Sequence, residues 1–461
     1  MGSNQTRRGF IGTTTAVGVG ALAGCLGDDD AEDDDSGGTG NGDDGGDDTV
    51  ELGDEDADHE IVVWHGMGGG LGEAFEEIAG EFEDENVRLS LQYQGSYRDV
   101  LNNTFAAQGT DDFPDVVQIA RYETRQVLDS GFFQPVENVL PDDYPVDDFL
   151  PALTNYFTVD DTLQSLPFNN SNAIGYYNRT MLEDAGLDPD DAPDTLETVR
   201  EYGAACVDEG LCDYAITWPN HMWFIENWYA LQGETLFDNG NGREDFASTI
   251  NLDQGPGLEV HEWWYDLNQN DLFLDPGEEA WGEATDAFLN EEAPIMINTT
   301  AQVRGVVNDA DFEAETMFHP TIGDRVGTPI GGGSFWVDDD LDDDKVDAVG
   351  SFISHMTDTD QQIFWHQQTG YYPVRQSGLD ALEDEGWFEE NPQFRTAVDQ
   401  LQNTEPTAAT AGAMIGDSHE IRSTVQEASY DVIESGEFDS RLGQAREDCE
   451  QILENYRADV E

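Results

Sequence analysis

The chain has 461 residues, of which 100 are Asp or Glu and 18 are Lys or Arg, so its formal net charge is −82 at pH 7. This charge makes nucleic acid and anionic membrane surfaces poor partners, and a hydrophobic content of 38% excludes an acidic disordered chain. Such an excess of acid stays soluble where concentrated salt shortens the range of charge repulsion, which is typical of a halophilic archaeon.

The first residues have a pattern typical of export. The segment "TRRGF" precedes a short apolar run that ends in "LAGC" at Cys25, and this run is too short for a membrane span of about 20 residues. Residues 1–24 resemble a twin-arginine lipoprotein signal that is cleaved before a lipidated Cys25, with an ordinary signal-peptide cysteine as the alternative. The acidic, glycine-rich residues 25–59 are expected to tether a folded body to the extracellular face of the cell membrane.

From residue 60 onward the pattern predicts alternating strands and helices in two or more lobes, because the length exceeds what one hydrophobic core usually supports. Residues 60–65 indicate a buried strand, residues 71–85 an amphipathic helix and residues 87–95 a second strand. This strand–helix–strand unit predicts a parallel sheet. Further strands are expected at residues 114–120, 293–300 and 330–337.

Capping residues predict where two later helices begin. Asp194 with Glu197, and Thr359 with Gln362, have the spacing of a capping box, and Gly370 is expected to end the second helix. The "YYPV" that follows is then expected to be an exposed turn with two aromatic rings.

Three cysteines follow Cys25 in the chain. Cys206 and Cys212 are close enough to form a disulfide loop in an oxidising exterior or to stay free, and Cys449 is left over. Their spacing matches no zinc pattern and the eight histidines are scattered, so neither a metal site nor a cofactor is predicted.

Motifs for catalysis are incomplete. No phosphate-binding loop occurs, "HEWWY" at His261 has Tyr265 where a zinc protease has a second histidine, and "GGGSFW" lacks the last glycine of a nucleophile elbow. Glycoside hydrolysis uses a pair of carboxylates, but among 100 acids such a pair is expected by chance and does not indicate a glycosidase. We therefore predict that the protein is not an enzyme, with a secreted polysaccharide hydrolase as the less favoured alternative.

Aromatic residues gather in residues 217–229, where Pro219 and Asn220 suggest a loop. A tryptophan in a loop either packs in the core or covers a bound molecule, such as the apolar face of a sugar or polyol. Trp218 and Trp223 are therefore candidate binding residues.

Six segments, in order, carry a resemblance over residues 60–457: "VVWHGMGGGLG", "YQGSYRDVLN", "LPFNNSNAIGYYNRTMLEDAGLDP", "IGGGSFWV", "WHQQTGYYPVR" and "HEIRSTVQE". Together they resemble the extracellular solute-binding proteins of ATP-binding-cassette (ABC) importers, and among these the proteins that bind glycerol 3-phosphate. The resemblance implies an α/β, two-lobed periplasmic-binding-protein-like fold of type II, with a cleft between the lobes.

The resemblance also implies how the chain is divided. Three segments are expected to cross between the lobes, near residues 167–172, 329–333 and 371–374. Lobe I would contain residues 60–169 and 332–372, and lobe II would contain residues 170–331 and 373–461.

The matching positions of the family assign residues to the solute. Hydroxyl groups, a backbone N–H and a guanidinium group suit phosphate or polyol oxygens. The matching residues are Tyr97, Ser171, Gly332, Tyr371, Arg422 and, in a less similar segment, Thr300.

Arg121 is a departure from the family pattern and a further candidate binding residue. An ungapped comparison places it where the family has a glutamate that helps to hold glycerol hydroxyls, and Glu123 can substitute only if the loop shifts. A second arginine would favour a more anionic or larger phosphoester; the alternative is a surface arginine paired with a nearby acid.

The resemblance predicts a lipid-anchored, monomeric protein that delivers a small phosphorylated polyol or a sugar to the membrane permease of an importer. A neutral oligosaccharide-binding protein of the same fold is the alternative within this class. No nucleic-acid partner is expected.

Overall fold

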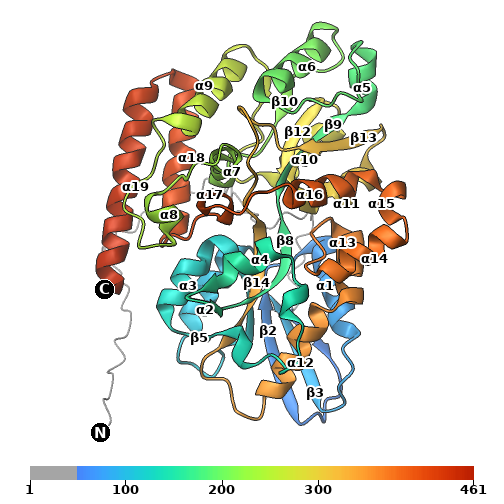
Figure 1. Ribbon diagram of the computed structural model, residues 1–461, viewed down its shortest axis with the longest axis vertical. Coiled ribbons are helices and arrows are strands. Elements are labelled where there is room, and N and C mark those ends of the chain that lie inside the picture. Colours follow the sequence, from blue (N-terminus) through green and yellow to red (C-terminus); the bar gives the residue numbers. More distant parts are fainter. Residues whose placement is uncertain (1–48) are drawn as a thin grey trace, which may run out of the picture. The chain divides into compact units, whose positions relative to one another are not determined.

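The structure is a computed structural model that describes residues 49–461. The predicted signal in residues 1–24 and the lipidated Cys25 lie outside the described residues, as does most of the predicted tether. Two main β-sheets organise the described part, and Figure 1 shows the first in its lower half and the second in its upper half.

The first sheet has seven strands in the order β1-β3-β2-β4-β14-β5, with β8 paired to β14. Strand β2 runs parallel to β3 and β4, which confirms the predicted strand–helix–strand unit, whereas β14 runs antiparallel to β4, β5 and β8. The strands are β1 (Thr49–Leu52), β2 (His59–His65), β3 (Val87–Tyr93), β4 (Val116–Ala120), β5 (Phe133–Gln134), β8 (Leu166–Ser171) and β14 (Gly331–Asp338).

The second sheet has five strands in the order β11-β10-β12-β9-β13. Strand β9 is antiparallel to both of its neighbours, and β10 is parallel to both of its own. The strands are β9 (Ala173–Asn178), β10 (Ile216–Thr217), β11 (Phe273–Leu274), β12 (Ile295–Thr299) and β13 (Ala314–Phe318); a separate hairpin pairs β6 (Thr158–Val159) with β7 (Thr162–Leu163).

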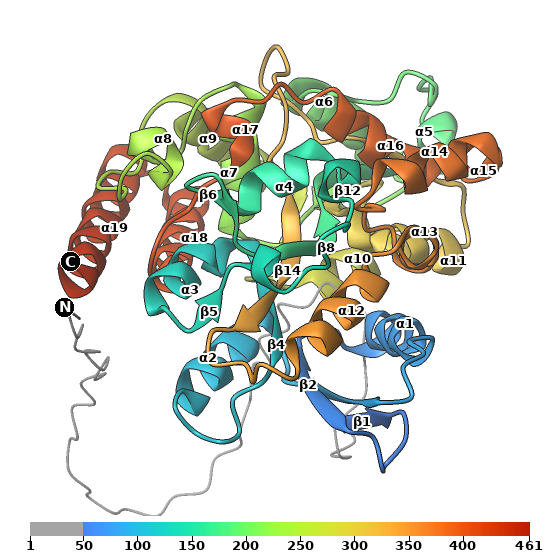
Figure 2. The same cartoon turned by 60° about the horizontal axis from the view of Figure 1, so that its bottom comes forward.

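Helices pack on both sheets and on one another (Figure 2). Helices against the first sheet are α1 (Gly69–Gly80), α2 (Tyr97–Ala107), α3 (Thr124–Ser130), α4 (Pro151–Phe157) and α12 (Val346–Met356). Those against the second are α5 (Arg179–Asp184), α6 (Leu196–Asp208), α9 (Gly255–Gln269), α10 (Trp281–Leu289) and α16 (Pro392–Gln402).

The remaining helices pack mainly on other helices or form short turns. They are α7 (Met222–Leu231), α8 (Asp238–Gly242), α11 (Val303–Asp309), α13 (Thr359–Thr369), α14 (Gln376–Asp384), α15 (Trp387–Glu390), α17 (Ala408–Ala411), α18 (Ser418–Ser435) and α19 (Phe438–Val460), with 3-10 turns η1 (Arg121–Glu123), η2 (Val136–Asn138), η3 (Val146–Asp148) and η4 (Thr300–Gln302).

The chain passes three times between the two groups of elements. Strand β8 of the first sheet ends at Ser171 and β9 of the second begins at Ala173, and the chain returns to the first sheet when β14 begins at Gly331. The third passage follows α13, which packs on α1, and leads to α16, which packs on β13. This is the type II arrangement expected above; the residue boundaries given there for the lobes stay a prediction.

Burial of apolar side chains explains both sheets. Ile61, Val63 and Leu89 are almost completely buried in the first, and Ile295 and Ile297 in the second. Burial of each such side chain contributes roughly 1.5 to 3 kcal/mol to the free energy of folding. The apolar runs from which the strands were predicted therefore form the core.

Strand β1 corrects the predicted tether. Residues 49–52 were expected to belong to it, but they pair antiparallel with β3. Val50 and Leu52 are apolar residues two positions apart and both pack against the core, so this part of the acidic segment has apolar surface to bury.

The helix starts also differ from the predictions by one residue. Helix α6 is capped by Thr195, whose side chain accepts from the N–H of Thr198, rather than by Asp194. Helix α13 is capped by Asp358, while Gly370 ends it in a left-handed conformation, as predicted. A side chain at the cap must reach back to the first turn, and neighbouring Asp and Thr residues both can, so the sequence alone leaves the choice open.

The lone lysine of the chain, Lys345, lies in the acidic loop before α12. Its ammonium group is 2.9 Å from both carboxylate oxygens of Asp115, which precedes β4.

Within residues 49–461, no helix has both the length and the apolar character needed to cross a membrane.

Candidate functional site

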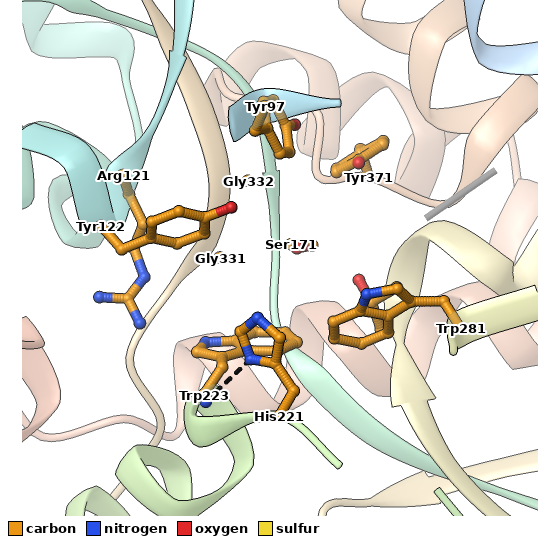
Figure 3. A pocket seen from close by; sticks show the side chains of 11 residues that line it. Tyr97, Arg121, Tyr122, Ser171, His221, Trp223, Trp281, Gly331, Gly332 and Tyr371 are labelled. Atoms are coloured by element: carbon orange, nitrogen blue, oxygen red, sulfur yellow. Dashed lines mark hydrogen bonds between the residues drawn. The ribbon is translucent and has the colours of Figure 1, made fainter. Parts of the chain in front are cut away.

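A small cavity opens where the ends of strands from both sheets approach one another (Figure 3). The first-sheet side supplies residues at the ends of β4, β8 and β14, and the second-sheet side supplies residues around α7, α10 and β12. The cavity has a volume of about 60 Å³. The lining residues are Tyr97, Arg121, Tyr122, Ser171, His221, Trp223, Trp281, Thr299, Gly331, Gly332 and Tyr371.

A chain of amides fixes the hydroxyl group of Tyr97. The side-chain amide of Asn169 donates to the Tyr97 Oη at 2.6 Å, and Gln118 donates to the Asn169 Oδ1 at 2.9 Å. The backbone N–H of Gly66 in turn donates to Gln118. Because Tyr97 accepts from Asn169, its own hydrogen can be donated elsewhere.

Glycine is required at position 332. Gly332 has a φ of +77°, and a Cβ atom there would lie 1.7 Å from the carbonyl oxygen of Asn169. Because glycine has no Cβ atom, β14 can lie close to β8 beside Ser171, and the ends of both strands form one wall of the cavity.

Tyr371 lines the cavity, but its surroundings differ from the prediction. The expected exposed turn is buried, with Tyr371 4% and Tyr372 0% exposed. The Tyr371 ring stacks on Trp365, and its carbonyl oxygen is 2.7 Å from the Nδ1 of His366. Packing against α13 therefore holds this aromatic pair in the interior.

Arg121 is a buried arginine with a carboxylate partner. It forms an ion pair with Glu226 of α7, whose Oε1 lies 3.1 Å from the Arg121 Nη1 and also accepts from the N–H of Ala413. Burial opposes the charge of Arg121, but the neighbouring Glu226 raises the pKa of the guanidinium group. The alternative was a surface arginine paired with a nearby acid. Arg121 is buried instead, although an acid, Glu226, does pair with it.

Arg422 of α18 lies directly behind the cavity wall. Its guanidinium is 4.1 Å from the ring centre of Tyr122, and its Nη1 is 3.2 Å from the Nε2 of His221. Its Nη2 contacts the Nδ1 of His419 at 2.7 Å and is 3.7 Å from Glu279. Two of its neighbours, Tyr122 and His221, are cavity residues.

His221 is a buried histidine in contact with Arg422. The backbone N–H of Trp223 is 3.0 Å from the Nδ1 of His221, and the Arg422 Nη1, which can only donate, is 3.2 Å from the Nε2. Burial, reinforced by Arg422, Arg121 and His419, lowers the pKa of His221 well below its usual value. His221 thus presents an uncharged ring to the guanidinium group of Arg422.

Glu123 takes no part in the cavity lining. It is fully buried, its Oε2 accepts from the hydroxyl of Ser418 at 3.1 Å, and its Oε1 is 2.6 Å from the Nε2 of His419. Glu123 therefore contacts His419, which in turn contacts Arg422, and it does not take the place of the family's glutamate in the cavity.

Two candidate residues are placed behind the wall or in the core. Thr300 is fully buried, and its neighbour Thr299 lines the cavity. Trp218 is 1% exposed and packs against other aromatic rings, with Trp263 at 5.3 Å and Phe273 at 4.3 Å between ring centres. Of the two interpretations of Trp218, packing in the core is the one the structure shows.

The structure adds five lining residues that were not singled out as candidates. His221 and Tyr122 flank residues that were named, and Gly331 belongs to the "IGGGS" segment, so their neighbours were the available signal. Thr299 directly precedes Thr300, the residue to which the family position was assigned from the sequence. Nothing in the local pattern pointed to Trp281, which reaches the cavity from the first turn of α10 (Figure 3).

The three cysteines within residues 49–461 are free, which corrects the possible disulfide between Cys206 and Cys212. Cys206 faces the core from α6, where its thiol contacts the carbonyl oxygen of Met181, and burial raises its pKa to about 12. Burial also raises the pKa of Cys212, to about 11. Among the described residues, no cluster of three His, Cys, Asp or Glu side chains could hold a metal ion.

Known proteins resemble this chain over most of its length. The glycerol-3-phosphate-binding periplasmic proteins UgpB of Escherichia coli (strain K12) and Shigella dysenteriae are 27% identical over 388 residues, 82% of this chain and 88% of each relative. In structure, UgpB from Mycobacterium tuberculosis in complex with glycerophosphocholine has a TM-score of 0.74 at 19% identity, covering 87% of this chain and 99% of that one.

A sugar-binding structure has a similar likeness. The cyclic alpha-maltosyl-1,6-maltose binding protein from Arthrobacter globiformis has a TM-score of 0.69 at 23% identity, covering 86% of this chain and 99% of that one. The model of the family described as bacterial extracellular solute-binding protein matches residues 71–396. The chain therefore belongs to the family of bacterial extracellular solute-binding proteins.

Proposed function

We propose that this protein is the solute-binding protein of an ABC importer and that it delivers a small phosphorylated polyol, glycerol 3-phosphate or a related phosphoester, to the permease. The observation that carries the proposal is one side of the cavity, where Arg121 and His221 line the wall beside Tyr122 and the buried Arg422 lies 4.1 Å from the Tyr122 ring. An oxyanion accepts from such donors better than from water, because the site is already ordered.

Hydroxyl groups opposite this side complete the site. Tyr97 and Ser171 can donate to or accept from polyol oxygens, and the backbone at Gly332 approaches closely because no side chain intervenes. The small volume suits a solute of a few carbon atoms. Binding alone would be the protein's task, with no chemical step.

The place of action also belongs to the proposal. Cys25 would carry the lipid, residues 26–48 would act as the tether, and the folded body would work as a monomer at the extracellular face of the membrane of a halophilic archaeon. Support comes from the "LAGC" segment, from the acidic composition and from a family whose members are named extracellular.

A neutral sugar is the second candidate. The rings of Trp223, Trp281 and Tyr371 line the cavity, and aromatic faces stack on the apolar faces of sugars. The likeness to a maltose-type binding protein agrees with this candidate in fold.

A melting experiment separates the two candidates. The purified protein in molar KCl would be heated with glycerol 3-phosphate, a glycerophosphodiester or a neutral disaccharide. A ligand at 100 times its Kd adds about 2.7 kcal/mol to the free energy of unfolding, which raises the melting temperature measurably. Stabilisation by a phosphoester supports the proposal; stabilisation by the disaccharide alone would overturn it in favour of the sugar.

A further inference from the structure

Three nitrogen atoms at the cavity wall can only donate hydrogen bonds. The indole Nε1 atoms of Trp223 and Trp281 and the Nε of Arg121 are buried, and none has a hydrogen-bond partner among the described residues. An indole or guanidinium N–H has no lone pair with which to accept. Buried donors of this kind cost free energy unless an acceptor meets them.

The cavity distinguishes these donors from similar ones elsewhere. The indole nitrogens of Trp264, Trp336 and Trp365 are also buried without a partner in the described part of the chain, but these residues do not line the cavity. A missing partner alone therefore indicates nothing about a ligand. Trp223 and Trp281 differ because their side chains line the cavity.

The lining also contains no charged acceptor. None of the eleven lining residues carries a carboxylate. The nearby Glu226 is occupied by the Nη atoms of Arg121 and by the N–H of Ala413. The side-chain acceptors of the lining are therefore mainly neutral hydroxyl groups, which can also donate, whereas the indole and guanidinium N–H groups can only donate and need acceptor oxygens from a solute.

Charge around Arg121 favours an anionic acceptor. Arg243 lies over the ring of Tyr156 at 4.5 Å, and Arg121 lies over the same ring at 5.5 Å. The N–H groups of Arg243 donate to the carbonyl oxygens of Gly412 and Ala411, which carry no formal charge. Glu226 pairs directly with Arg121 and acts only through its electric field on Arg243.

We propose that the solute is a phosphoester whose second functional group is an oxyanion, such as a carboxylate, and that Arg121 and Trp281 select it through their Nε–H and Nε1–H donors. Figure 3 shows Arg121 and Trp281 on opposite sides of the cavity, so together they would contact oxygens along the solute's length. This inference rests on the proposed function, because it requires a small phosphoester in the cavity.

The test compares two molecules that differ at one carbon. Glycerol 3-phosphate ends in a hydroxymethyl group, whereas 3-phosphoglycerate has a carboxylate there. Titration calorimetry in molar KCl should show 3-phosphoglycerate binding at least about tenfold more tightly to the wild-type protein, because charged acceptors strengthen hydrogen bonds.

Trp281→Phe removes the N–H and keeps an aromatic ring. This variant should bind 3-phosphoglycerate about tenfold more weakly than wild type, and glycerol 3-phosphate less than about threefold more weakly. Trp336→Phe, which removes a buried, partnerless indole N–H in the core of the first sheet, is the matched control and should leave both affinities unchanged.

Each outcome bears on a different claim. If glycerol 3-phosphate binds wild type as tightly as 3-phosphoglycerate does, or if Trp281→Phe behaves like Trp336→Phe, the inference is wrong and the proposed function stands. If wild type binds neither phosphoester, the proposed function fails and the inference fails with it. A folded Trp281→Phe protein is verified by its melting temperature, and Trp281→Tyr, which restores a donor, should recover part of the affinity if the variant is stable.

Discussion

At the scale of single residues, most assignments from the matching motifs lie in one place. Tyr97, Ser171, Gly332 and Tyr371 line a common cavity although they are far apart in sequence. Trp218 was open between binding and packing because an indole ring serves both purposes, and only the tertiary contacts with Trp263 and Phe273 separate them. Trp281 could not be identified from the sequence, because the residues that form the cavity with it come from segments far away in the chain.

Arg422 should be the main anion-binding residue of the proposed site. Arg422→Ala should weaken binding of a phosphoester by about ten- to a hundredfold, since a hydrogen bond to a charged group contributes roughly 1.5 to 3 kcal/mol. Arg422→Lys should restore only part, because an ammonium group lacks the planar fork of donors. Calorimetry in molar KCl measures both. The exposed Arg441→Ala on α19 is the control, and unchanged affinity in Arg422→Ala would contradict the assignment.

Trp218 should matter for stability and not for the solute. Trp218→Ala should lower the free energy of unfolding by about 3 to 5 kcal/mol, because it removes a large ring from a packed core. Trp223→Ala should instead weaken solute binding, since Trp223 lines the cavity. Thermal unfolding and titration of both variants decide; a specific binding defect with normal stability in Trp218→Ala would reverse the two roles.

At the scale of helices and strands, the sequence predicted which elements exist better than where they begin. The strands around Val63, Leu89 and Val117 follow from apolar runs that only burial can satisfy. Helix starts depend on which of several neighbouring polar side chains turns toward the first turn, and that choice is made by packing. The edge strand β1 was missed because the acids around Val50 and Leu52 outweigh these two apolar residues in any compositional reading.

The start of α6 provides a direct test of a capping residue. Thr195→Ala should destabilise the protein by about 1 kcal/mol, because the N–H of Thr198 loses its side-chain acceptor. Asp194→Ala changes the neighbouring side chain, which makes no cap, and should have a smaller effect. Thermal unfolding in the same salt compares the two, and a larger loss in Asp194→Ala would return the cap to the residue predicted from sequence.

At the scale of the whole molecule, net charge sets the conditions for folding. An excess of 82 negative charges repels itself across the chain, and only concentrated salt screens this repulsion. The far-ultraviolet circular dichroism should therefore show loss of native structure after dialysis into low-salt buffer, and recovery when molar KCl is restored. A full native signal in low salt would contradict this prediction.

Membrane attachment should depend on one atom, the sulfur of Cys25. Cys25→Ser should release the protein from the membrane fraction of the native host, because a serine cannot take the thioether-linked lipid of a lipoprotein. Fractionation and mass spectrometry measure the change. Persistence of the variant in the membrane fraction would show that something other than Cys25 anchors it.

The contact between Lys345 and Asp115 has a consequence for anyone who wishes to follow this protein in solution. The chain has a single lysine, so an amine-reactive dye has one side-chain target in all 461 residues. In the folded state that amine is held by both oxygens of Asp115 and partly shielded. The rate of labelling at Lys345 would thus report, without any engineered tag, how often the acidic loop before α12 opens.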